Sequence, residues 1–115
     1  MTAYTLHKLW SWLPMYGITL GSHIFLKNPN DQVALAHELV HVKQQQDMGL
    51  WFWVAYALLL PVGWNPYRAR LEAQAYATDV RAGVPVEVCA VYLSGALYGW
   101  CCRRARAEEL IRSFL

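Results

Sequence analysis

Two histidines four residues apart, with a glutamate directly after the first, are the residues whose types and spacing could do chemistry in this chain. His37, Glu38 and His41 form the pattern HExxH. On a helix, residues four apart lie on one face, so both imidazoles can reach one metal ion. Glu38 is turned by about one residue from His37 and points to the side of that ion, where a water molecule would lie. The pattern therefore indicates a zinc site with Glu38 as the base that activates water.

The segment around this pattern has the marks of a helix. Asn30 or Asp31 can serve as the N-cap, apolar residues recur at helical spacing, and Gly49 is a stop signal. We therefore expect a helix from Asp31 to Met48. The competing interpretation is that both histidines satisfy hydrogen bonds in the core, while Glu38 is an exposed surface residue.

A catalytic zinc site needs a third protein ligand, and Glu72 is the candidate. A carboxylate on a helix face of small residues can approach another helix closely. The neighbours of Glu72 are small or apolar, namely Leu71, Ala73, Ala75 and Ala77. The alternative is an ordinary surface glutamate paired with Arg68. The remaining histidines, His7 and His23, lie upstream, and we expect His23 to be a polar residue of a strand or turn.

Around these residues the sequence predicts an α+β, predominantly helical fold. The chain of 115 residues is long enough for one core, so we expect a single domain over residues 1–115. Gly21-Ser22 separates two short β-prone runs and predicts a β-hairpin over residues 16–27. Three further helices are expected: a buried one over residues 50–60, ended by Pro61 and Gly63; one over 66–82, opened by Asn65-Pro66; and one over 86–100, continued by a polar tail.

Composition excludes some classes of function. The formal net charge of +2 gives no indication of a nucleic-acid surface. The three cysteines, two of them adjacent, do not make a disulfide framework and favour a reducing, cytoplasmic location. Apolar residues make up 57% of the chain, but the apolar stretches 50–63 and 88–102 are shorter than the roughly 20 residues that span a bilayer. Core helices are favoured, and the Trp-rich segments with basic flanks leave a peripheral membrane contact as the alternative.

The chemistry-bearing segments resemble a known family. HELVHVKQQ at residues 37–45, followed by Asn65-Pro66 and then by EAQAY at residues 72–76, is similar to the gluzincins. The resemblance is greatest to the minigluzincins and to short bacterial and phage HExxH proteins, and it covers about residues 16–82. It implies hydrolysis of peptide bonds, with Zn²⁺ bound by His37, His41 and Glu72 and with Glu38 as general base. It also implies a small zincin-like domain, with an active-site helix, a glutamate-ligand helix and a small sheet whose outer strand borders the cleft.

One position departs from this family. Larger gluzincins carry an aspartate four residues after the glutamate ligand, where it orients a histidine, and this chain has Tyr76 there. Tyr76 lies one turn after Glu72, so its hydroxyl could stabilise an oxyanion or hold a ligand histidine; the alternative is a packing aromatic. Asp79, two turns after Glu72, is a weaker candidate for supporting a histidine. The aromatic residues Trp51, Trp53 and Tyr56 have near-helical spacing and are expected in the core.

The sequence thus predicts a zinc metallopeptidase acting on a peptide or protein substrate. The hairpin at residues 16–27 could supply a strand to which an extended peptide adds, although a purely structural hairpin fits equally well. Two other functions stay open: a zinc-binding module without turnover, and a small membrane-associated helical protein with a chance HExxH. The substrate, the cleavage preference and the oligomeric state have no signal in the sequence.

Overall fold

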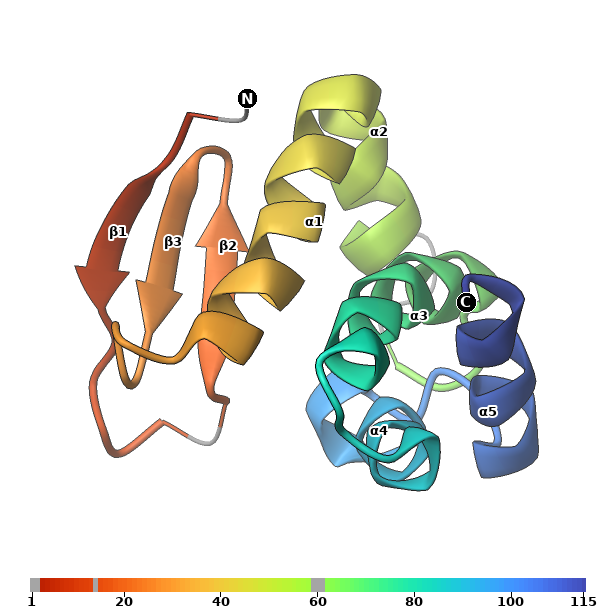
Figure 1. Ribbon diagram of the computed structural model, residues 1–115. Coiled ribbons are helices and arrows are strands. Elements are labelled where there is room, and N and C mark those ends of the chain that lie inside the picture. Colours follow the sequence, from red (N-terminus) through yellow and green to blue (C-terminus); the bar gives the residue numbers. More distant parts are fainter. Residues whose placement is uncertain (1–2, 14, 59–61) are drawn as a thin grey trace.

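Three short strands precede a series of helices in the computed structural model, which describes residues 3–13, 15–58 and 62–115 (Figure 1). The strands are β1 (Thr5–Lys8), β2 (Gly17–Leu20) and β3 (His23–Leu26). The helical segments are α1 (Gln32–Met48), α2 (Leu50–Trp53), the π-helical η1 (Val54–Leu58), α3 (Pro66–Arg81), α4 (Val86–Leu93), the 3₁₀ turn η2 (Ala96–Tyr98) and α5 (Arg104–Ser113). The predicted α+β, mostly helical class is confirmed.

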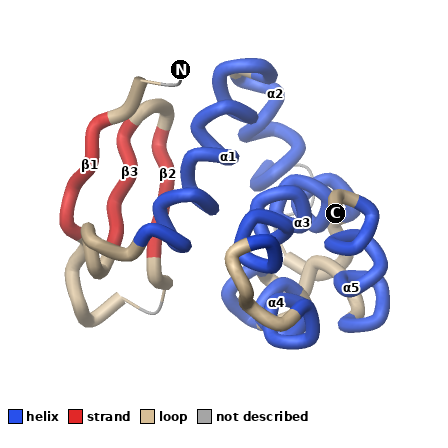
Figure 2. The backbone as a smooth tube through the Cα atoms, in the orientation of Figure 1, coloured by secondary structure: helices blue, strands red, loops and turns tan. Residues whose placement is uncertain are grey.

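The strands form one mixed sheet in the order β1-β3-β2 (Figure 2). β2 and β3 are antiparallel and make the predicted hairpin, in which Gly21 has a φ of 62° at the turn. β1 runs parallel to β3 and was not predicted, because four residues without a neighbouring turn signal leave no local mark. The order makes β2 an edge strand, next to which α1 packs.

Capping residues fix both helices that carry the predicted site. Asp31 is the N-cap of α1, where its side chain accepts a hydrogen bond from the N–H of Ala34 at 3.0 Å, and Gly49 ends the helix with a φ of 59°. The side chain of Asn65 caps α3 by accepting hydrogen bonds from the N–H groups of Tyr67 and Arg68, and Pro66 occupies the first turn. These boundaries agree with the predicted ones because both caps are local features of the sequence.

Two helix predictions were wrong in part. The segment after Val86 is not one helix to Trp100: α4 ends at Leu93, and Gly95 begins a short turn. The expected polar tail is the helix α5, because Ala107, Leu110 and Ile111 recur at helical spacing and bury one face.

The segment 50–58 is helical as expected, but only one side of it is buried. Phe52 is buried, whereas Leu50 and Trp51 are 83% and 72% exposed, so the prediction that Trp51 lies in the core was wrong. The predicted end at Leu60 and Pro61 lies outside the described residues. Within the part of the chain that the structure describes, no helix has the length and apolar character needed to cross a membrane.

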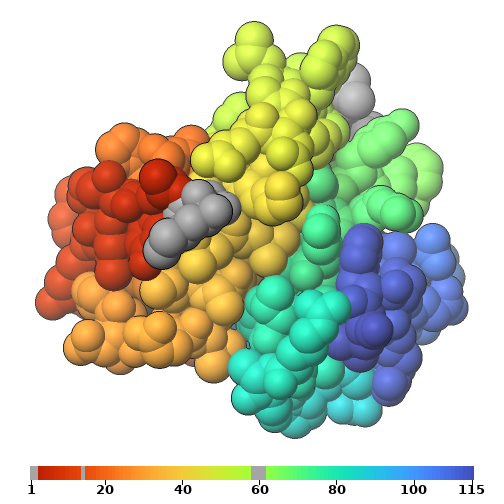
Figure 3. All heavy atoms as spheres, turned by 45° about the horizontal axis from the view of Figure 1, so that its top comes forward, coloured from red at the N-terminus to blue at the C-terminus, as the bar shows by residue number. Residues whose placement is uncertain are grey.

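Two separate cores lie on either side of the pair α1 and α3. One lies between the sheet and α1, around Ile24, Leu26 and Val42. The other joins α3, α4 and α5 and includes Leu93 and Ile111. The surface view shows the strands and the C-terminal helices on opposite sides, with α1 and α2 between them (Figure 3). Because α1 and α3 make the junction between the two cores, side chains that they direct at each other are enclosed.

Candidate metal centre

Three predicted ligands meet between α1 and α3. The Nε2 atom of His37 lies 3.2 Å from Oε2 of Glu72, and Nε2 of His41 lies 3.1 Å from each oxygen of the same carboxylate. All three residues are buried, with exposed fractions of 7% or less. Two alanines of α3, Ala69 and Ala73, are fully buried on either side of Glu72 in the sequence. Both alanines pack in the core that α3 shares with α4 and α5.

Each imidazole is held from behind by a hydrogen-bond acceptor. Nδ1 of His37 donates to Oδ1 of Asp79 at 3.0 Å, and Nδ1 of His41 donates to Oε1 of Gln44 at 2.9 Å. The amide of Gln44 is oriented by its own donor, Nε2, which bonds the carbonyl of Leu71 at 2.9 Å. A carboxylate and an amide oxygen only accept, so both rings carry a proton on Nδ1 and direct Nε2 at Glu72. Such partners are typical of metal-binding histidines.

The donor set fits a zinc ion. A tetrahedral ion with bonds of about 2.0–2.1 Å holds its ligand atoms about 3.3 Å apart. The imidazole–carboxylate distances of 3.1–3.2 Å come close to that spacing. Two imidazole nitrogens and one carboxylate oxygen are also the ligand types of many catalytic zinc sites, which keep a fourth position open. Among the described residues, this is the one buried group of three such side chains whose ligand atoms lie within 4.8 Å of one another.

The electrostatics of the three residues favour a positive charge at their centre. Burial by itself raises the pKa of Glu72, but the positive charge of His41 and the hydrogen bonds from both histidines hold that pKa well below its ordinary value. Burial by itself lowers the pKa of His37, yet hydrogen bonds to Asp79 and Glu72 raise it to about 10. The protons on the two imidazoles supply this positive charge, and a metal ion held by the same three residues would take their place.

Glu38 lies beside this group and is tied to the sheet. The hydroxyl of Thr19 on β2 donates to Oε2 of Glu38 at 2.5 Å, and only 7% of Glu38 is exposed. A Cβ atom on Gly17 would lie 3.0 Å from Oε1 of Glu38 and 2.8 Å from a side-chain carbon of Leu26. Gly17 therefore permits a contact between strand and glutamate that any larger residue would disturb. The sequence pattern did not predict Thr19 and Gly17 as site residues, because their role depends on a strand packing against a helix.

Glu38 lies in the wall of two cavities. The larger, of about 260 Å³, includes His41, Glu72 and the aromatic residues Phe52, Trp53 and Tyr56 in its wall. The smaller, of about 200 Å³, includes His37, Tyr76 and Asp79. Both cavities share five lining residues: Met15, Gly17, Glu38, Leu97 and Tyr98. Space for a ligand thus exists in two cavities that Glu38 and Gly17 of the edge strand both line.

Two tyrosines lie near the three ligands, and they have different surroundings. The Tyr76 ring packs edge-on against His37 with centroids 4.5 Å apart, and its hydroxyl bonds the hydroxyl of Tyr98 at 2.9 Å. Tyr56, which we expected in the core, instead donates from its hydroxyl to Oε1 of Glu72 at 2.5 Å. Burial and the negative charge of Glu72 raise the pKa of Tyr56 well above its ordinary value, so the hydroxyl keeps its proton.

The remaining predicted residues also have definite places. Asp79, and not the tyrosine at position 76, bonds the far side of the His37 ring. His23 is a strand residue as expected, and its Nδ1 lies 3.1 Å from Nε2 of His7 on the sheet, outside the metal centre. Of the residues that the sequence missed, Tyr56 lies on the π-helical segment η1. Such segments often occur at functional sites, but they leave no pattern in a single sequence.

Comparison with known families finds a similarity in the N-terminal part of the chain. Residues 11–49, about a third of the chain, match a family model described as the eCIS core domain. The match spans β2, β3 and α1, so it includes His37, Glu38 and His41, whereas Glu72 lies beyond it. No curated protein sequence and no solved structure matches the chain. The similarity therefore covers the hairpin and the HExxH helix alone.

Proposed function

We propose that this protein is a zinc-dependent metallopeptidase that hydrolyses peptide bonds. The observation that carries the proposal is the convergence of His37, His41 and Glu72 at 3.1–3.2 Å, with both imidazoles fixed from behind. A buried structural zinc site is usually closed by four protein ligands, whereas a catalytic site has three. The three ligands, the adjacent carboxylate of Glu38 and the two flanking cavities together support catalysis over a purely structural site.

The metal has one chemical contribution in this proposal. When bound by these three residues, zinc supplies Lewis-acid chemistry that lowers the pKa of a water molecule to about 7. The protein contributes the ligands, their orientation and an enclosed site. Asp79 and Gln44 hold the imidazoles so that their free nitrogens point at one place. Preorganisation of this kind removes the cost of ordering the ligands at the time of binding.

Glu38 is the proposed general base. Its carboxylate lies in the wall of both cavities and accepts the hydrogen bond of Thr19 through one oxygen, Oε2. The other oxygen, Oε1, is the one nearest Gly17 and remains for a proton from water. In hydrolysis, Glu38 takes that proton as the water oxygen attacks the peptide carbonyl carbon, and then passes it to the nitrogen of the leaving amine.

A tyrosine hydroxyl is proposed to stabilise the oxyanion that forms on the carbonyl carbon. Tyr56 is better placed for this role than Tyr76, because it lines the larger cavity together with Glu38, His41 and Glu72. Its proton is directed at Glu72 and would turn to the substrate oxygen. Tyr76, whose hydroxyl is bonded to Tyr98, is proposed to act on the His37 ring that it contacts.

The substrate is proposed to be a peptide or protein segment in extended form. β2 is an edge strand whose four residues all line the larger cavity, and its first residue, Gly17, also lines the smaller one. An extended chain can add to such an edge by main-chain hydrogen bonds, which bring its carbonyl groups past Glu38. These main-chain hydrogen bonds do not depend on any particular side chain of the peptide.

The proposal is tested by metal analysis and by a peptide-library digest. The purified protein should contain about one zinc per chain, and cleavage by the wild type should stop on chelation. Glu38→Gln retains the size of the side chain but cannot accept a proton, so zinc should remain while the rate falls by roughly 10²–10⁴-fold. Zinc binding without cleavage in any sample would instead support the module without turnover. Cleavage that survives both chelation and Glu38→Gln would place the activity elsewhere.

A further inference from the structure

The outer edge of β2 consists of the backbone N–H and carbonyl groups that point away from β3. Lys27 donates to the carbonyl of Tyr16 at 2.9 Å, just before the strand begins, so residue 16 faces β3. In an antiparallel pair the backbone groups of successive residues point alternately toward and away from the partner strand. Residues 18 and 20 therefore also face β3, and the backbone groups of Gly17 and Thr19 point to the outer edge.

One side chain already occupies part of this edge. Gln45 of α1 accepts from the N–H of Gly21 through Oε1 at 2.6 Å and donates from Nε2 to the carbonyl of Thr19 at 3.1 Å. The side chain is buried, with 8% exposed, and lies one turn after His41. The Gln45 amide thus accepts from the N–H of Gly21 and donates to the carbonyl of Thr19, two residues earlier. These are the same kind of hydrogen bonds that the backbone of an added strand would make.

Three backbone groups of the edge are left open. Among the described residues, the N–H and carbonyl of Gly17 and the N–H of Thr19 have no hydrogen-bond partner. These groups flank Glu38, which contacts both residues. We infer that Gln45 ends the peptide-binding edge, so that a bound chain pairs with Gly17 and the N–H of Thr19 and then leaves the strand. The inference rests on the proposed function, because it describes how a peptide enters that same cleft.

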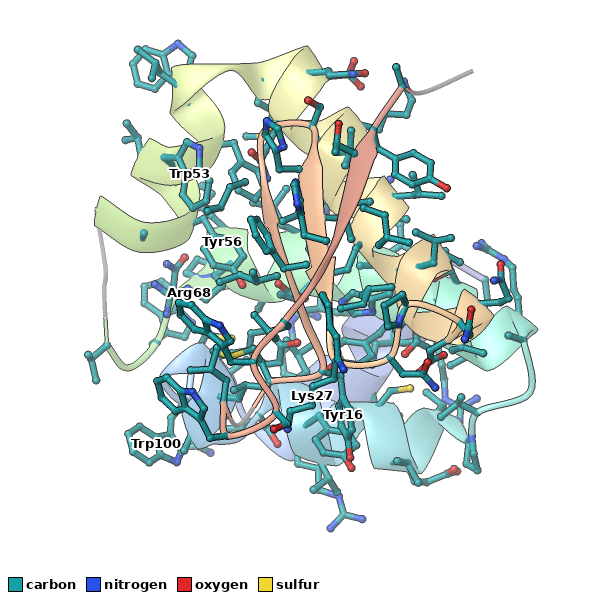
Figure 4. The ribbon with its side chains drawn as sticks, turned by 90° about the vertical axis from the view of Figure 1, so that its left-hand side faces the viewer. Tyr16, Lys27, Trp53, Tyr56, Arg68 and Trp100 are labelled. Atoms are coloured by element: carbon teal, nitrogen blue, oxygen red, sulfur yellow. The ribbon has the colours of Figure 1, made fainter. Side chains whose placement is uncertain are left out.

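The point at which the chain must leave the strand lies in the wall of the larger cavity, which Thr19 and Gln45 both line. Leu20, Phe52 and Trp53 line this cavity together with Gln45. Trp53 and Tyr56 lie beside the edge of the sheet on the segment that follows α1 (Figure 4). A chain turned away by Gln45 therefore brings its next side chain to an aromatic wall, which selects a large apolar residue by burial of apolar surface. Gln45 is in this way a specificity-determining residue.

The pattern of main-chain hydrogen bonds tests the inference. The probe is a fluorescent heptapeptide of alanine with one central phenylalanine, and its amides are replaced by esters one at a time to remove single N–H donors. Affinity is measured in a Glu38→Gln background, where the probe is not cleaved. In that parent, one ester position that faces the Gly17 carbonyl should weaken binding by about two- to tenfold. In Gln45→Met the carbonyl of Thr19 is released, so a second position, two residues from the first, should become sensitive.

Gln46 provides the matched control. It is the next residue on the same helix and is exposed, and its side chain makes no hydrogen bond within the described part of the chain. Gln46→Met should keep the single sensitive position of the parent. Zinc content is measured alongside and shows whether Gln45→Met leaves the metal centre intact. A further variant, Gln45→Glu, keeps the acceptor for the N–H of Gly21 but lacks the donor for the carbonyl of Thr19. In this variant too, the second ester position should weaken binding.

Amide hydrogen exchange gives a readout that does not depend on turnover. In the parent, the N–H of Gly21 should be protected from exchange even without peptide. In Gln45→Met, it should be protected only when peptide is bound. The N–H groups of Gly17 and Thr19 should gain protection on peptide binding in both proteins. The inference is overturned if Gln45→Met shows only the one ester position that weakens binding in the parent. It is also overturned if the N–H groups of Gly17 and Thr19 gain no protection at millimolar probe. Either result holds even if the library digest shows cleavage. Protection without cleavage by the wild type refutes the proposed peptidase and leaves the role of Gln45 standing.

Discussion

The hydroxyl of Thr19 donates a 2.5 Å hydrogen bond to Oε2 of Glu38, and so joins the edge strand β2 to the HExxH helix α1. The bond joins two residues that are 19 positions apart in the sequence. It orients the carboxylate that the proposed mechanism uses as a base. Thr19 is therefore a positioning residue, and its effect can be separated from that of Glu38 itself.

Thr19→Val should slow turnover without removing the metal. Valine keeps the shape of threonine but leaves Oε2 of Glu38 without its donor, and a hydrogen bond to a charged group contributes about 1.5–3 kcal/mol. If that orientation matters mainly in the transition state, kcat should fall by about 10- to 100-fold with KM little changed. Thr19→Ser restores the hydroxyl and should recover most of the rate. Equal loss in the valine and serine variants would show that packing, and not the bond, is responsible.

Removal of ligands should change zinc content in a graded way. His37→Ala and His41→Ala should each abolish tight binding, because each leaves two ligands, and Glu72→Ala should weaken binding strongly. Zinc per chain is measured by elemental analysis after dialysis. The exposed pair His7 and His23 supplies the control, since His23→Ala should leave the content unchanged. Full occupancy in the His37→Ala/His41→Ala double variant would contradict the assignment.

Asp79→Asn should lower zinc affinity while leaving all three ligands in place. The carboxylate accepts the Nδ1 proton of His37 and fixes its ring, and loss of such a partner typically reduces affinity 10- to 100-fold. Affinity is measured by competition with a chromophoric chelator. Asp47→Asn, at an exposed site of α1 paired with Lys43, is the control and should bind zinc like the wild type. Equal affinity in Asp79→Asn and wild type would remove Asp79 from the supporting role.

The two tyrosines should give different kinetic results. Tyr56→Phe deletes the hydroxyl that faces the cavity of Glu38, and should lower kcat about 10-fold or more with zinc retained. Tyr76→Phe deletes a hydroxyl bonded to Tyr98, keeps the ring against His37, and should cost less. Steady-state kinetics with zinc-loaded protein decides between them. A larger loss in Tyr76→Phe than in Tyr56→Phe would return the oxyanion role to Tyr76.

Ile111→Ala should destabilise the protein markedly, because α5 is part of the core. Ile111 is fully buried against α3 and α4, and truncation of such a side chain typically costs about 2–5 kcal/mol. The free energy of unfolding is measured in urea. Glu109→Ala, two residues earlier on the exposed face, should change it by less than about 0.5–1 kcal/mol. A small effect of Ile111→Ala would mean that the C-terminal segment does not pack as described.

What the sequence determined by itself is local in origin. The spacing of His37 and His41 follows from the helical repeat, and the caps Asp31 and Asn65 act within three residues of the groups they bond. The hairpin around Gly21 is similarly local. These features sufficed to predict the HExxH helix, the glutamate helix and three of the residues that meet in the centre, with the resemblance to gluzincins adding their roles.

Only the tertiary structure decided which residues surround that centre. Asp79 and not Tyr76 bonds the His37 ring, Tyr56 comes from an expected core position to Glu72, and Thr19 and Gln45 connect α1 to β2. Each of these contacts joins segments 16 or more residues apart, and their side chains look like packing or surface residues in the sequence. Hydrogen bonds between distant segments depend on how two helices and a strand pack, and no periodicity in the chain records that packing.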